Sequence, residues 1–315
     1  MNKETGMKAI AINDFATDAT VHQLPEPTPG PGEVLVRVEA SSVNGIDVHV
    51  ASGMLKGMIE YKLPIVLGRD YAGTVEAVGS GVTGLEVGDS VFGVFMRSTF
   101  GAFGAFGELV AAPAMFAAKI PDGLAVESAG ALGLAGATAL AAIDAIDPKP
   151  GEVVLISGAT GGIGSFAVQL AKVRGATVIA AARTEDAGYV TGLGADATVD
   201  YDAGLNAAVR AQHPDGIDAI VHAAGDGAQL ATLLKPGGRI ASTIGLTAEQ
   251  VGDTGAKVTT IMVMPTTDIL DRLAAMVIRG DLTVPIYRTY ELEGAGRALK
   301  DFTAGKRGKV AITVR

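Results

Sequence analysis

The chain contains no cysteine. Among its 315 residues this excludes disulfides, thiolate nucleophiles and thiolate metal ligands. Charged residues are also scarce, at 19%, and Lys and Arg total 25 against 34 Asp and Glu, which gives a formal net charge of −9. No basic block occurs. Surfaces for nucleic acids or anionic membranes need clustered Lys and Arg, so we expect neither partner.

No targeting or membrane segment is evident either. Residues 1–12, MNKETGMKAIAI, lack the apolar segment of a secretory signal, so we expect a cytoplasmic location. The least polar window, 128–143, is shorter than the roughly 18–20 strongly apolar residues of a membrane span. Its alanines and glycines indicate a closely packed helix. A hydrophobic content of 48% suffices for one large or two ordinary domains with full cores.

The two parts of the chain differ in their pattern. Residues 1–122 carry turn clusters and half-buried strand patterns, as in 33–41, where Val34, Val36 and Val38 alternate with polar residues. The closing segment 308–315 alternates in the same way. We expect 1–122 and 285–315 to form one small, mostly antiparallel β-barrel domain that binds substrate.

From residue 123 to 284 short β-rich runs alternate with helical stretches. This rhythm is typical of βαβ units and predicts an α/β domain with a doubly wound parallel sheet. The expected strands lie within 152–157, 176–182, 197–200, 217–225, 238–245 and 257–264.

A glycine-rich turn, SGATGGIG, follows the first of these runs at 157–164 and precedes a helical segment. A dinucleotide pyrophosphate binds where a helix N-terminus presents free N–H groups and a turn without side chains lets the backbone approach. The strand–turn–helix context strengthens the motif. The expected cofactor-binding residues of the turn are Gly158, Ala159, Thr160, Gly161, Gly162, Ile163 and Gly164.

A second nucleotide signal follows the next expected strand. NAD enzymes place an acidic residue there for the ribose, whereas NADP enzymes use a basic one. Arg183 therefore favours NADPH, since a charge-assisted hydrogen bond to the 2′-phosphate is worth about 1.5–3 kcal/mol. Glu185 and Asp186 follow closely, so NAD or dual use stays open. A short-chain dehydrogenase is excluded by the late position of the turn and because no tyrosine has a lysine four residues later.

Several segments together resemble the medium-chain dehydrogenase/reductase superfamily, in particular its zinc-free quinone oxidoreductase branch. They include SSVNGIDVHVASG (41–53), LPIVLGRDYAGTVEAVGSGVTGLEVGDSVFG (63–93), the glycine turn and LGADATVDY (193–201). The resemblance implies a Rossmann domain inserted into a GroES-like barrel. It also implies a homodimer, with the edge strand at 257–264 as the expected contact.

The resemblance further implies a set of site residues. Asn44 and Asp47 would lie beside the nicotinamide or substrate as catalytic residues, and Tyr201 near the adenosine 2′-phosphate. Thr138 would bind cofactor from the start of the helix before the glycine turn. Cofactor contacts are also expected at Ala223, Ala224, Gly225 and Gly245.

The roles of several polar residues stay open. Asn44 either donates to the oxygen of the acceptor or caps a turn. Asp47 and Asp70 fit buried partners of the backbone or Arg69 better than general acids. His222, at a strand end, is either a proton donor or a histidine with internal partners.

The sequence predicts no zinc site. Where the superfamily's alcohol dehydrogenases carry a zinc-binding Gly-His-Glu, this chain reads Gly68-Arg69-Asp70, and a protonated arginine cannot ligate a metal. His49 is expected on a helix surface, without the partners that a metal site needs.

The stretch 92–110 is rich in phenylalanine and glycine. We expect Phe95, Met96, Phe100 and Phe103 to line an apolar substrate pocket, with Phe92 in the core.

Without a metal, the economical chemistry is hydride transfer from NADPH to a small, apolar, electron-poor acceptor. A quinone or α,β-unsaturated carbonyl meets that condition. Two alternatives remain: an enoyl-thioester reductase, and an NADPH-binding protein without turnover.

Overall fold

The computed structural model describes residues 6–97, 99–305 and 307–315, which form two compact units. The described residues within 6–134, 264–278 and 286–315 form the first unit, and Ala135–Val263 with Arg279–Pro285 form the second. This division keeps 123–134 and 264–278 with the first unit, whereas the sequence-based bounds assigned both segments to the second domain. Residues 1–5 of the N-terminal stretch and residue 98 of the phenylalanine-rich stretch lie outside the described residues.

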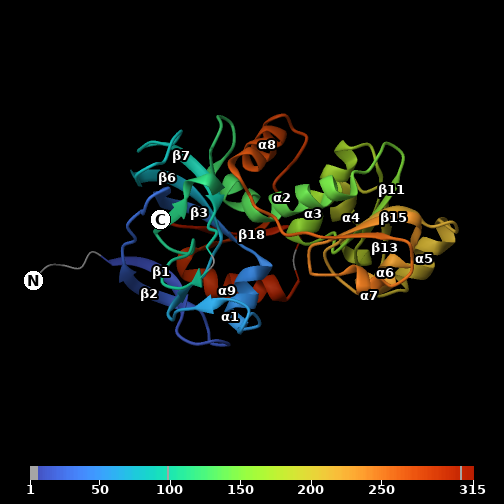
Figure 1. Cartoon of the computed structure of the whole chain (residues 1–315), viewed down its shortest axis with the longest axis horizontal. Helices are drawn as coiled ribbons and strands as arrows, with labels where there is room; N and C mark the ends of the chain where they lie inside the picture. Colours follow the sequence, from blue (N-terminus) through green and yellow to red (C-terminus); the bar gives the residue numbers. More distant parts are fainter. Residues whose placement is uncertain (1–5, 98, 306) are drawn as a thin grey trace, which may run out of the picture. The chain divides into compact units, whose positions relative to one another are not determined.

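The first unit consists mainly of strands (Figure 1). They are β1 Gly6–Ile12, β2 Thr20–Pro25, β3 Glu33–Val43, β4 Glu60–Tyr61, β5 Ile65–Val66, β6 Asp70–Val78, β7 Ser90–Val94, β8 Thr99–Phe100, β9 Leu109–Pro113, β10 Ala117–Lys119, β17 Ile286–Glu291 and β18 Lys309–Thr313. Its helices are α1 Gly45–Ser52, α8 Thr267–Ile278 and α9 Ala295–Thr303, with the short turns η1 Ala114–Phe116 and η3 Leu292–Gly294.

The strands of the first unit pair into separate sheets. The largest has the order β10-β7-β6-β3-β18-β17, with β9 also paired to β3. Its β17–β18 pair is parallel, whereas β18–β3 and β3–β6 are antiparallel. A second sheet has the order β2-β1-β5, and β4 pairs with β8. Within the described residues these sheets do not close on themselves, so the expected barrel is not confirmed.

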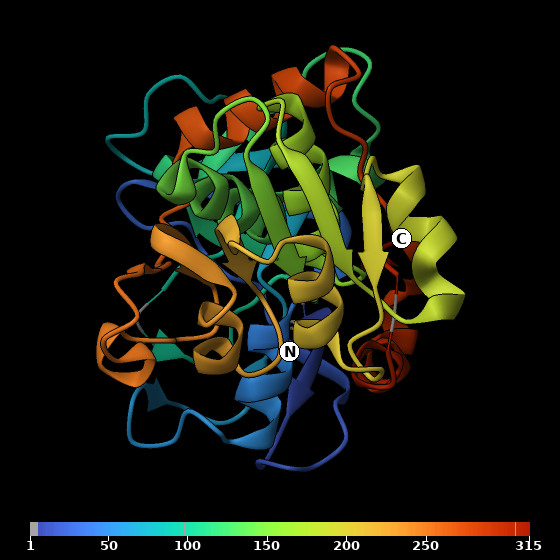
Figure 2. The same cartoon turned by 90° about the vertical axis from the view of Figure 1, so that its right-hand side faces the viewer.

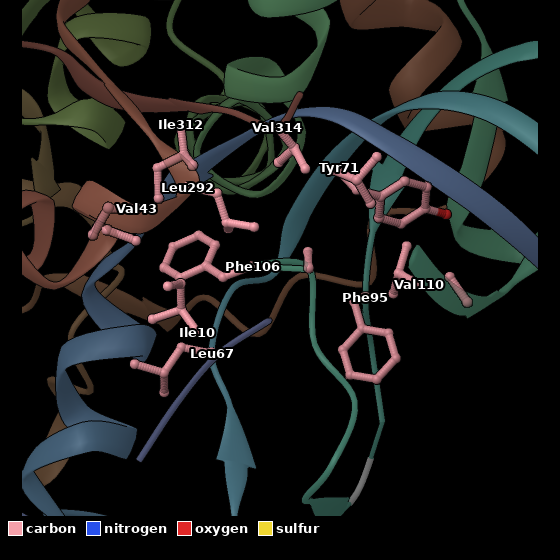
Figure 3. Packing of buried hydrophobic residues seen from close by; sticks show 14 of the residues in the cluster. Ile10, Val43, Leu67, Tyr71, Phe95, Phe106, Val110, Leu292, Ile312 and Val314 are labelled. Carbon is pink, nitrogen blue, oxygen red and sulfur yellow. The ribbon is translucent and has the colours of Figure 1, made fainter. Parts of the chain in front are cut away.

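The core of the first unit follows the predicted alternation along β3. Val34, Val36 and Val38 are buried, while Arg37 and Glu39 between them are exposed. Side chains from distant segments meet in the same core, because period-2 strands turn one face toward it. Figure 3 shows this packing for Ile10, Val43, Leu67, Phe106, Leu292 and Ile312.

The second unit contains the predicted parallel sheet (Figure 2). Its strands are β11 Val153–Ser157, β12 Thr177–Ala181, β13 Ala197–Val199, β14 Ile217–His222, β15 Leu234–Ser242 and β16 Lys257–Thr260. Its helices are α3 Gly162–Val173, α4 Ala187–Gly192, α5 Leu205–Gln212, α6 Gly227–Ala231 and α7 Ala248–Val251, with the short turn η2 Thr184–Asp186.

All neighbours in the order β13-β12-β11-β14-β15-β16 are parallel, which confirms the doubly wound arrangement. The order reverses between β11 and β14. Ligands of such sheets bind beyond the carboxyl ends of the strands at this reversal. Ser157 ends β11 and His222 ends β14, so these two residues mark the position of the expected crevice.

Helix α2, Val126–Ile146, corrects one expectation about length. The apolar window at 128–143 belongs to a helix of 21 residues, which is long and apolar enough to cross a membrane by length and composition alone. However, 78% of its most apolar 18-residue window is buried against the protein's own residues, as in a core helix.

Candidate functional site

A buried carboxylate, Asp70, lies at the first position of β6. Its Oδ2 accepts hydrogen bonds from Ser42 Oγ at 2.6 Å and from Asn44 Nδ2 at 2.8 Å. The same oxygen lies 3.2 Å from Lys309 Nζ, and Oδ1 accepts from the backbone N–H of Leu134 at 2.7 Å. A carboxylate with 0% exposure needs such partners, because an isolated buried charge is strongly unfavourable.

Lys309 is the partner of Asp70 that the sequence analysis missed. This lysine begins β18 and is only 1% exposed. Besides contacting Asp70, its Nζ donates to Asn44 Oδ1 at 2.6 Å and to the Val43 carbonyl at 3.1 Å. An ammonium has three donors, so these partners account for all of them. In sequence, Lys309 shows only a lysine at the edge of an alternating apolar run, which gives no sign of its burial.

The amide of Asn44 is fully engaged in this cluster. Its Oδ1 accepts from Lys309, and its Nδ2 donates to Asp70 and, at 3.3 Å, to the Ser42 carbonyl. A donation from Asn44 to an acceptor oxygen, one of its two expected roles, would therefore require one of these bonds to break. Its other expected role is visible, since Asn44 is the N-cap residue of α1.

Asp47 contacts the backbone on both sides of the cluster. Its Oδ2 accepts from the N–H of Asn44 at 2.8 Å, and its Oδ1 from the N–H of Gly68 at 3.1 Å. Burial raises the pKa of Asp47 to about 6, against the effect of the bond from Asn44, which lowers it. These contacts match the expectation of a buried partner of the backbone.

Gly68 makes this arrangement possible. Its φ of +93° is one that residues with a side chain rarely adopt, and a Cβ there would lie 2.3 Å from the ring of Phe106. Only glycine can therefore bring its N–H to Asp47 at this point.

Arg69 is a buried cation with few partners. Its side chain is part of a residue only 6% exposed, and its Nη1 donates to the Phe95 carbonyl at 2.8 Å. Its Cζ lies 3.8 Å from the centroid of the Phe100 ring. Within the described residues the guanidinium forms no salt bridge and no further hydrogen bond. Burial lowers the pKa of Arg69 to about 10, so the group stays protonated at neutral pH.

The expected substrate residues lie around two hollows of the first unit. One is a pocket of about 480 Å³, lined by Glu33, Lys62, Phe95, Arg97, Thr99, Gly101, Ala102 and Phe103. The other encloses about 200 Å³ of empty space, open solvent included, and has no room for a water molecule. It is lined by Asp47, Val50, Val66, Leu67, Gly68, Arg69, Phe95, Phe100 and Phe103.

Phe95 and Phe103 border both hollows, and Phe100 borders the narrower one. Phe103 is 37% exposed, whereas Phe95 and Phe100 are buried. Met96 is half-buried and lines neither hollow. Phe92 is fully buried in the core, as expected.

The glycine turn of the second unit is shaped by close backbone contacts. A Cβ on Gly164 would lie 2.1 Å from the Gly158 carbonyl oxygen, and Gly158 has a φ of +67°. Helix α3 begins at Gly162, and its N-cap Gly161 carries no side chain to satisfy the first N–H groups. Such a helix N-terminus favours an anion. Thr160 and Ile163 are half-buried, and Ala159 is buried.

Ser157 and His222 join the strands at the reversal point. Ser157 Oγ accepts from the N–H groups of Ala223 and Ala224 at 3.1 and 3.3 Å, and donates to the Ala224 carbonyl at 2.8 Å. His222 is 3% exposed, with Nδ1 3.0 Å from Ser242 Oγ and Nε2 3.1 Å from the Gly225 carbonyl. Both ring nitrogens therefore have internal partners, as in the second of the two roles considered. The sequence analysis did not foresee the bridging role of Ser157.

A pocket of about 260 Å³ lies beside His222 in the second unit. Gly225 and Gly245, both expected to contact cofactor, line it. Both have positive φ, +84° and +90°, so the backbone turns there in a way that favours glycine.

Arg183 and Tyr201, two residues expected near the 2′-phosphate, lie together. The Cζ of Arg183 is 5.6 Å from the centroid of the Tyr201 ring, within the range of a cation–π contact. Arg183 Nε also donates to Asp202 Oδ2 at 3.0 Å, and this bond raises the pKa of Arg183. Asp202 was missed, because the sequence drew attention to the nearer Glu185.

Thr138 requires a correction. It lies in the middle of α2 rather than at the start of the helix, because the helix begins at Val126. It is 8% exposed and is not without an interaction partner.

Among the residues that the structure describes, no group of three or more His, Asp or Glu side chains is arranged to hold a metal ion. His49 is exposed on α1, as expected.

Comparison with known proteins gives two family matches. Residues 30–122 match the alcohol dehydrogenase GroES-like domain, and residues 162–270 match the family described as zinc-binding dehydrogenase. The two matches correspond to a strand-rich unit and a doubly wound sheet, the combination found in two-domain dehydrogenases.

Individual sequence relatives support the same family assignment. A chloroplast envelope quinone oxidoreductase homolog of Arabidopsis thaliana is 35% identical over 229 residues, which cover 69% of this chain and 68% of that protein. A trans-enoyl reductase of Aspergillus flavipes is 35% identical over 261 residues, covering 78% of this chain and 72% of that protein.

Solved structures extend the likeness to nearly the whole chain. The quinone oxidoreductase of Coxiella burnetii has a TM-score of 0.89 at 29% identity, covering 98% of this chain and 100% of that one. A mycobacterial protein solved in complex with NADPH has a TM-score of 0.85 at 28% identity, covering 98% and 99%. The chain belongs to the medium-chain dehydrogenase/reductase superfamily, a superfamily of oxidoreductases, and is quinone oxidoreductase-like.

We predict that removing Lys309 from the buried cluster destabilises the protein strongly. Lys309→Met leaves Asp70 buried without its counter-ion and should lower the free energy of unfolding by about 3–5 kcal/mol in urea titrations. Adding Asp70→Asn should recover part of that loss, because the buried charge is then gone.

Lys119→Met is the matched control. It breaks the exposed pair of Lys119 with Asp89, 2.9 Å apart, and should cost at most about 1 kcal/mol. Strictly additive effects of Lys309→Met and Asp70→Asn would contradict the coupling that the structure indicates.

Proposed function

We propose that this protein is an NADPH-dependent, zinc-independent oxidoreductase that transfers a hydride to a quinone or an α,β-unsaturated carbonyl. The observation that carries the proposal is the position of Arg183 with Tyr201. Arg183 follows β12, the strand that pairs in parallel with β11, which leads into the glycine turn. In a doubly wound sheet that binds a dinucleotide, a residue at this position contacts the adenosine ribose or its 2′-phosphate.

The residues of the second unit fit a dinucleotide. The close approach of Gly164 to Gly158 and the uncapped start of α3 fit a pyrophosphate, and Arg183 fits a 2′-phosphate. Gly225 and Gly245 offer backbone without side chains beside the pocket at His222. The mycobacterial neighbour solved with NADPH supports this assignment.

Bound NADPH would supply the hydride, and the first unit would hold the acceptor. The pocket of about 480 Å³ is of the size that small-molecule sites have, and Phe95 and Phe103 give it apolar walls. These walls would orient a planar acceptor and exclude water around its reacting carbon.

Zinc independence is supported by the donor set of this chain. Zinc in dehydrogenases is held by thiolate, imidazole and carboxylate ligands. The chain has no cysteine, and the guanidinium of Arg69 cannot ligate a cation. Both nearby carboxylates accept from protein donors, Asp70 from the Lys309 cluster and Asp47 from two backbone N–H groups. The residues present do not fit a catalytic zinc, although one matching family is described as zinc-binding.

An enoyl-thioester reductase is the second candidate. The likeness to the trans-enoyl reductase of Aspergillus flavipes favours it. Two cations, Lys62 and Arg97, line the large pocket and would suit the phosphate groups of a thioester carrier. Each has an acidic partner, Glu60 and Glu33 respectively, so the pocket carries little net charge.

We also propose a homodimer that forms through β16, the last strand in the order of the parallel sheet. Edge strands present unpaired backbone groups that a second copy can pair with. Just beyond β16, Met262 is 89% exposed, an apolar side chain that such a contact would cover.

We predict that the protein oxidises NADPH in the presence of quinones or 2-alkenals. Initial rates should be measured at 340 nm with quinones, 2-alkenals and enoyl thioesters under identical conditions. Faster turnover of enoyl thioesters would favour the second candidate. Tight NADPH binding with no acceptor reduced would overturn the proposed activity and favour a binding protein.

Cofactor choice should depend on Arg183. Arg183→Ala should weaken NADPH binding by about ten- to a hundredfold and leave NADH binding nearly unchanged, as measured by quenching of dihydronicotinamide fluorescence. Asp202→Asn should strengthen NADPH binding, because it removes the carboxylate that competes with the phosphate for Arg183. Arg174→Ala, at the far end of α3, should change neither affinity. An unchanged preference for NADPH in Arg183→Ala would refute the assignment.

Replacing Met262 with a charged residue should weaken the proposed dimer. Met262→Asp should shift the monomer–dimer equilibrium toward monomer in sedimentation velocity, since it would place a charge in an apolar contact. Met58→Asp, at a methionine of the first unit that is 78% exposed, is the control and should leave the equilibrium unchanged. Wild-type protein that sediments as a monomer at all concentrations would exclude the dimer.

A further inference from the structure

Two polar groups near the narrow hollow of the first unit have bonding capacity that the protein does not use. Arg69 is one, since its guanidinium has five N–H donors and its side chain makes one hydrogen bond among the described residues. Tyr61 is the other, since its hydroxyl is buried with no hydrogen-bond partner there. Buried polar groups normally have partners, because an unsatisfied one costs about 1–3 kcal/mol. A ligand oxygen would supply the missing acceptor.

The two groups share one aromatic neighbour, Phe100. The Tyr61 ring centroid lies 5.6 Å from that of Phe100, and the Arg69 Cζ lies 3.8 Å from the same Phe100 centroid. The charge of Arg69 acts on Tyr61, where it opposes the rise in the pKa of the phenol that burial causes. Both donors therefore lie beside Phe100, a residue that lines the narrow hollow together with Arg69.

Two hydrogen bonds with the Phe95 backbone hold Arg69 in place. The Phe95 carbonyl accepts from the Arg69 side chain, and the Phe95 N–H donates to the Arg69 carbonyl at 2.6 Å. Phe95 also lines the 480 Å³ pocket, as does Phe103, whose side chain is partly exposed and borders both hollows. Exposed side chains change rotamer within nanoseconds, so Phe103 can open a way from the pocket to Arg69.

We propose that Arg69, assisted by the Tyr61 hydroxyl, binds the carbonyl oxygen of the acceptor and stabilises the negative charge that this oxygen gains during reduction. This rests on the proposed function. When a hydride from the reduced dihydronicotinamide forms a new C–H bond at the β-carbon, the C=C π bond breaks and its electrons move toward the oxygen. The acceptor, reduced by the two electrons of the hydride that bound NADPH would supply, would become an enolate, and a proton from solvent would complete the reduction.

The electrostatics of the site suit this role. A cation held in a dry site interacts with a developing charge far more strongly than one in water, and it does not have to reorganise. The alternative donor, Asn44, has both amide N–H groups bonded inside the cluster. Arg69 thus takes the electrophilic role that a metal fills in zinc-dependent dehydrogenases, and among the described residues no group of three His, Asp or Glu side chains could hold a metal ion there.

The first test needs no cofactor and no turnover. The probe is 4-nitrophenol, whose phenolate absorbs visible light and mimics an enolate, compared with 4-nitrotoluene, which has no ionisable oxygen. At fixed pH, wild-type protein should bind the phenolate in preference to the neutral phenol. Arg69→Met should reduce phenolate affinity at least about tenfold and keep 4-nitrotoluene affinity, because only the charge-assisted bond is lost.

Further variants test whether the phenolate binds at Arg69 rather than at another arginine. Arg37→Met removes a surface arginine that pairs with Glu76 and should leave phenolate binding unchanged. Tyr61→Phe, which removes one hydroxyl, should weaken phenolate binding by about three- to tenfold with little risk to the fold. Loss of phenolate binding in Arg97→Met but not in Arg69→Met would place the anion in the pocket of about 480 Å³ that Arg97 lines, and would overturn the proposal.

The second test uses turnover. Arg69→Met should lower kcat by about a hundred- to a thousandfold, and Arg69→Lys by less, while the Kd for NADPH stays within about twofold. Thermal unfolding checks that each variant is folded. A folded Arg69→Met with wild-type kcat would overturn the proposal. If wild-type protein reduces no acceptor but its phenolate binding depends on Arg69, the anion site stands and the proposed function fails.

Discussion

The buried ion pair between Asp70 and Lys309 ties together the start of β6, the start of β18 and the end of β3. Removing two charges from water costs several kcal/mol each, and their attraction offsets this only when the remaining bonding capacity is satisfied. Here it is satisfied. Asp70 accepts from Ser42, Asn44 and Leu134 besides the lysine, and Lys309 donates to Asn44 and Val43 besides the aspartate. Such a network is stable in one arrangement only, so it fixes the relative positions of the segments that it joins.

The geometry around Arg69 follows from that constraint. In an extended chain successive side chains point to opposite sides, so when Asp70 turns into the cluster, Arg69 turns away from it toward Phe95 and Phe100. Gly68, one residue earlier, donates its N–H to Asp47. The three residues therefore have separate roles. Gly68 makes a backbone contact, Arg69 presents a cation to the narrow hollow, and Asp70 forms the buried ion pair. This division explains how an arginine is held in a buried place without a salt bridge, with the Asp47 carboxylate acting on it only through the field of its charge.

Sequence patterns could predict the features that depend on local rules. The alternation of Val34, Val36 and Val38, and the strand–turn–helix context of Gly158 and Gly164, are local, and the structure has both. Sequence patterns could not predict the contacts between residues far apart in the chain. Nothing near Lys309 in the sequence indicates that its ammonium meets Asp70, 239 residues away.

The features that sequence analysis got wrong or missed have the same origin. The start of α2 at Val126 depends on packing, which extends the helix beyond its most apolar window and leaves Thr138 in its middle. The partner of Arg183 is Asp202 rather than a neighbour in sequence, because parallel pairing of β12 and β13 brings the ends of these strands together. The open sheets of the first unit likewise depend on which strands pair, and alternation alone does not determine that.

Ion pairs in this chain serve two purposes, according to their exposure. Arg183 and Asp202 are 52% and 63% exposed in their side chains, and exposed pairs of this kind contribute at most about 1 kcal/mol. The 2′-phosphate of the proposed cofactor would therefore take the place of Asp202 with a net gain, because its charge is larger and its oxygens match the guanidinium. The pair of Lys309 and Asp70, with side chains 2% and 0% exposed, cannot exchange partners in this way, because opening it would leave a charge in the core. Salt should consequently weaken the proposed interaction of Arg183 with a 2′-phosphate and leave the ion pair of Lys309 and Asp70 intact, since screening acts on exposed charges far more than on buried ones.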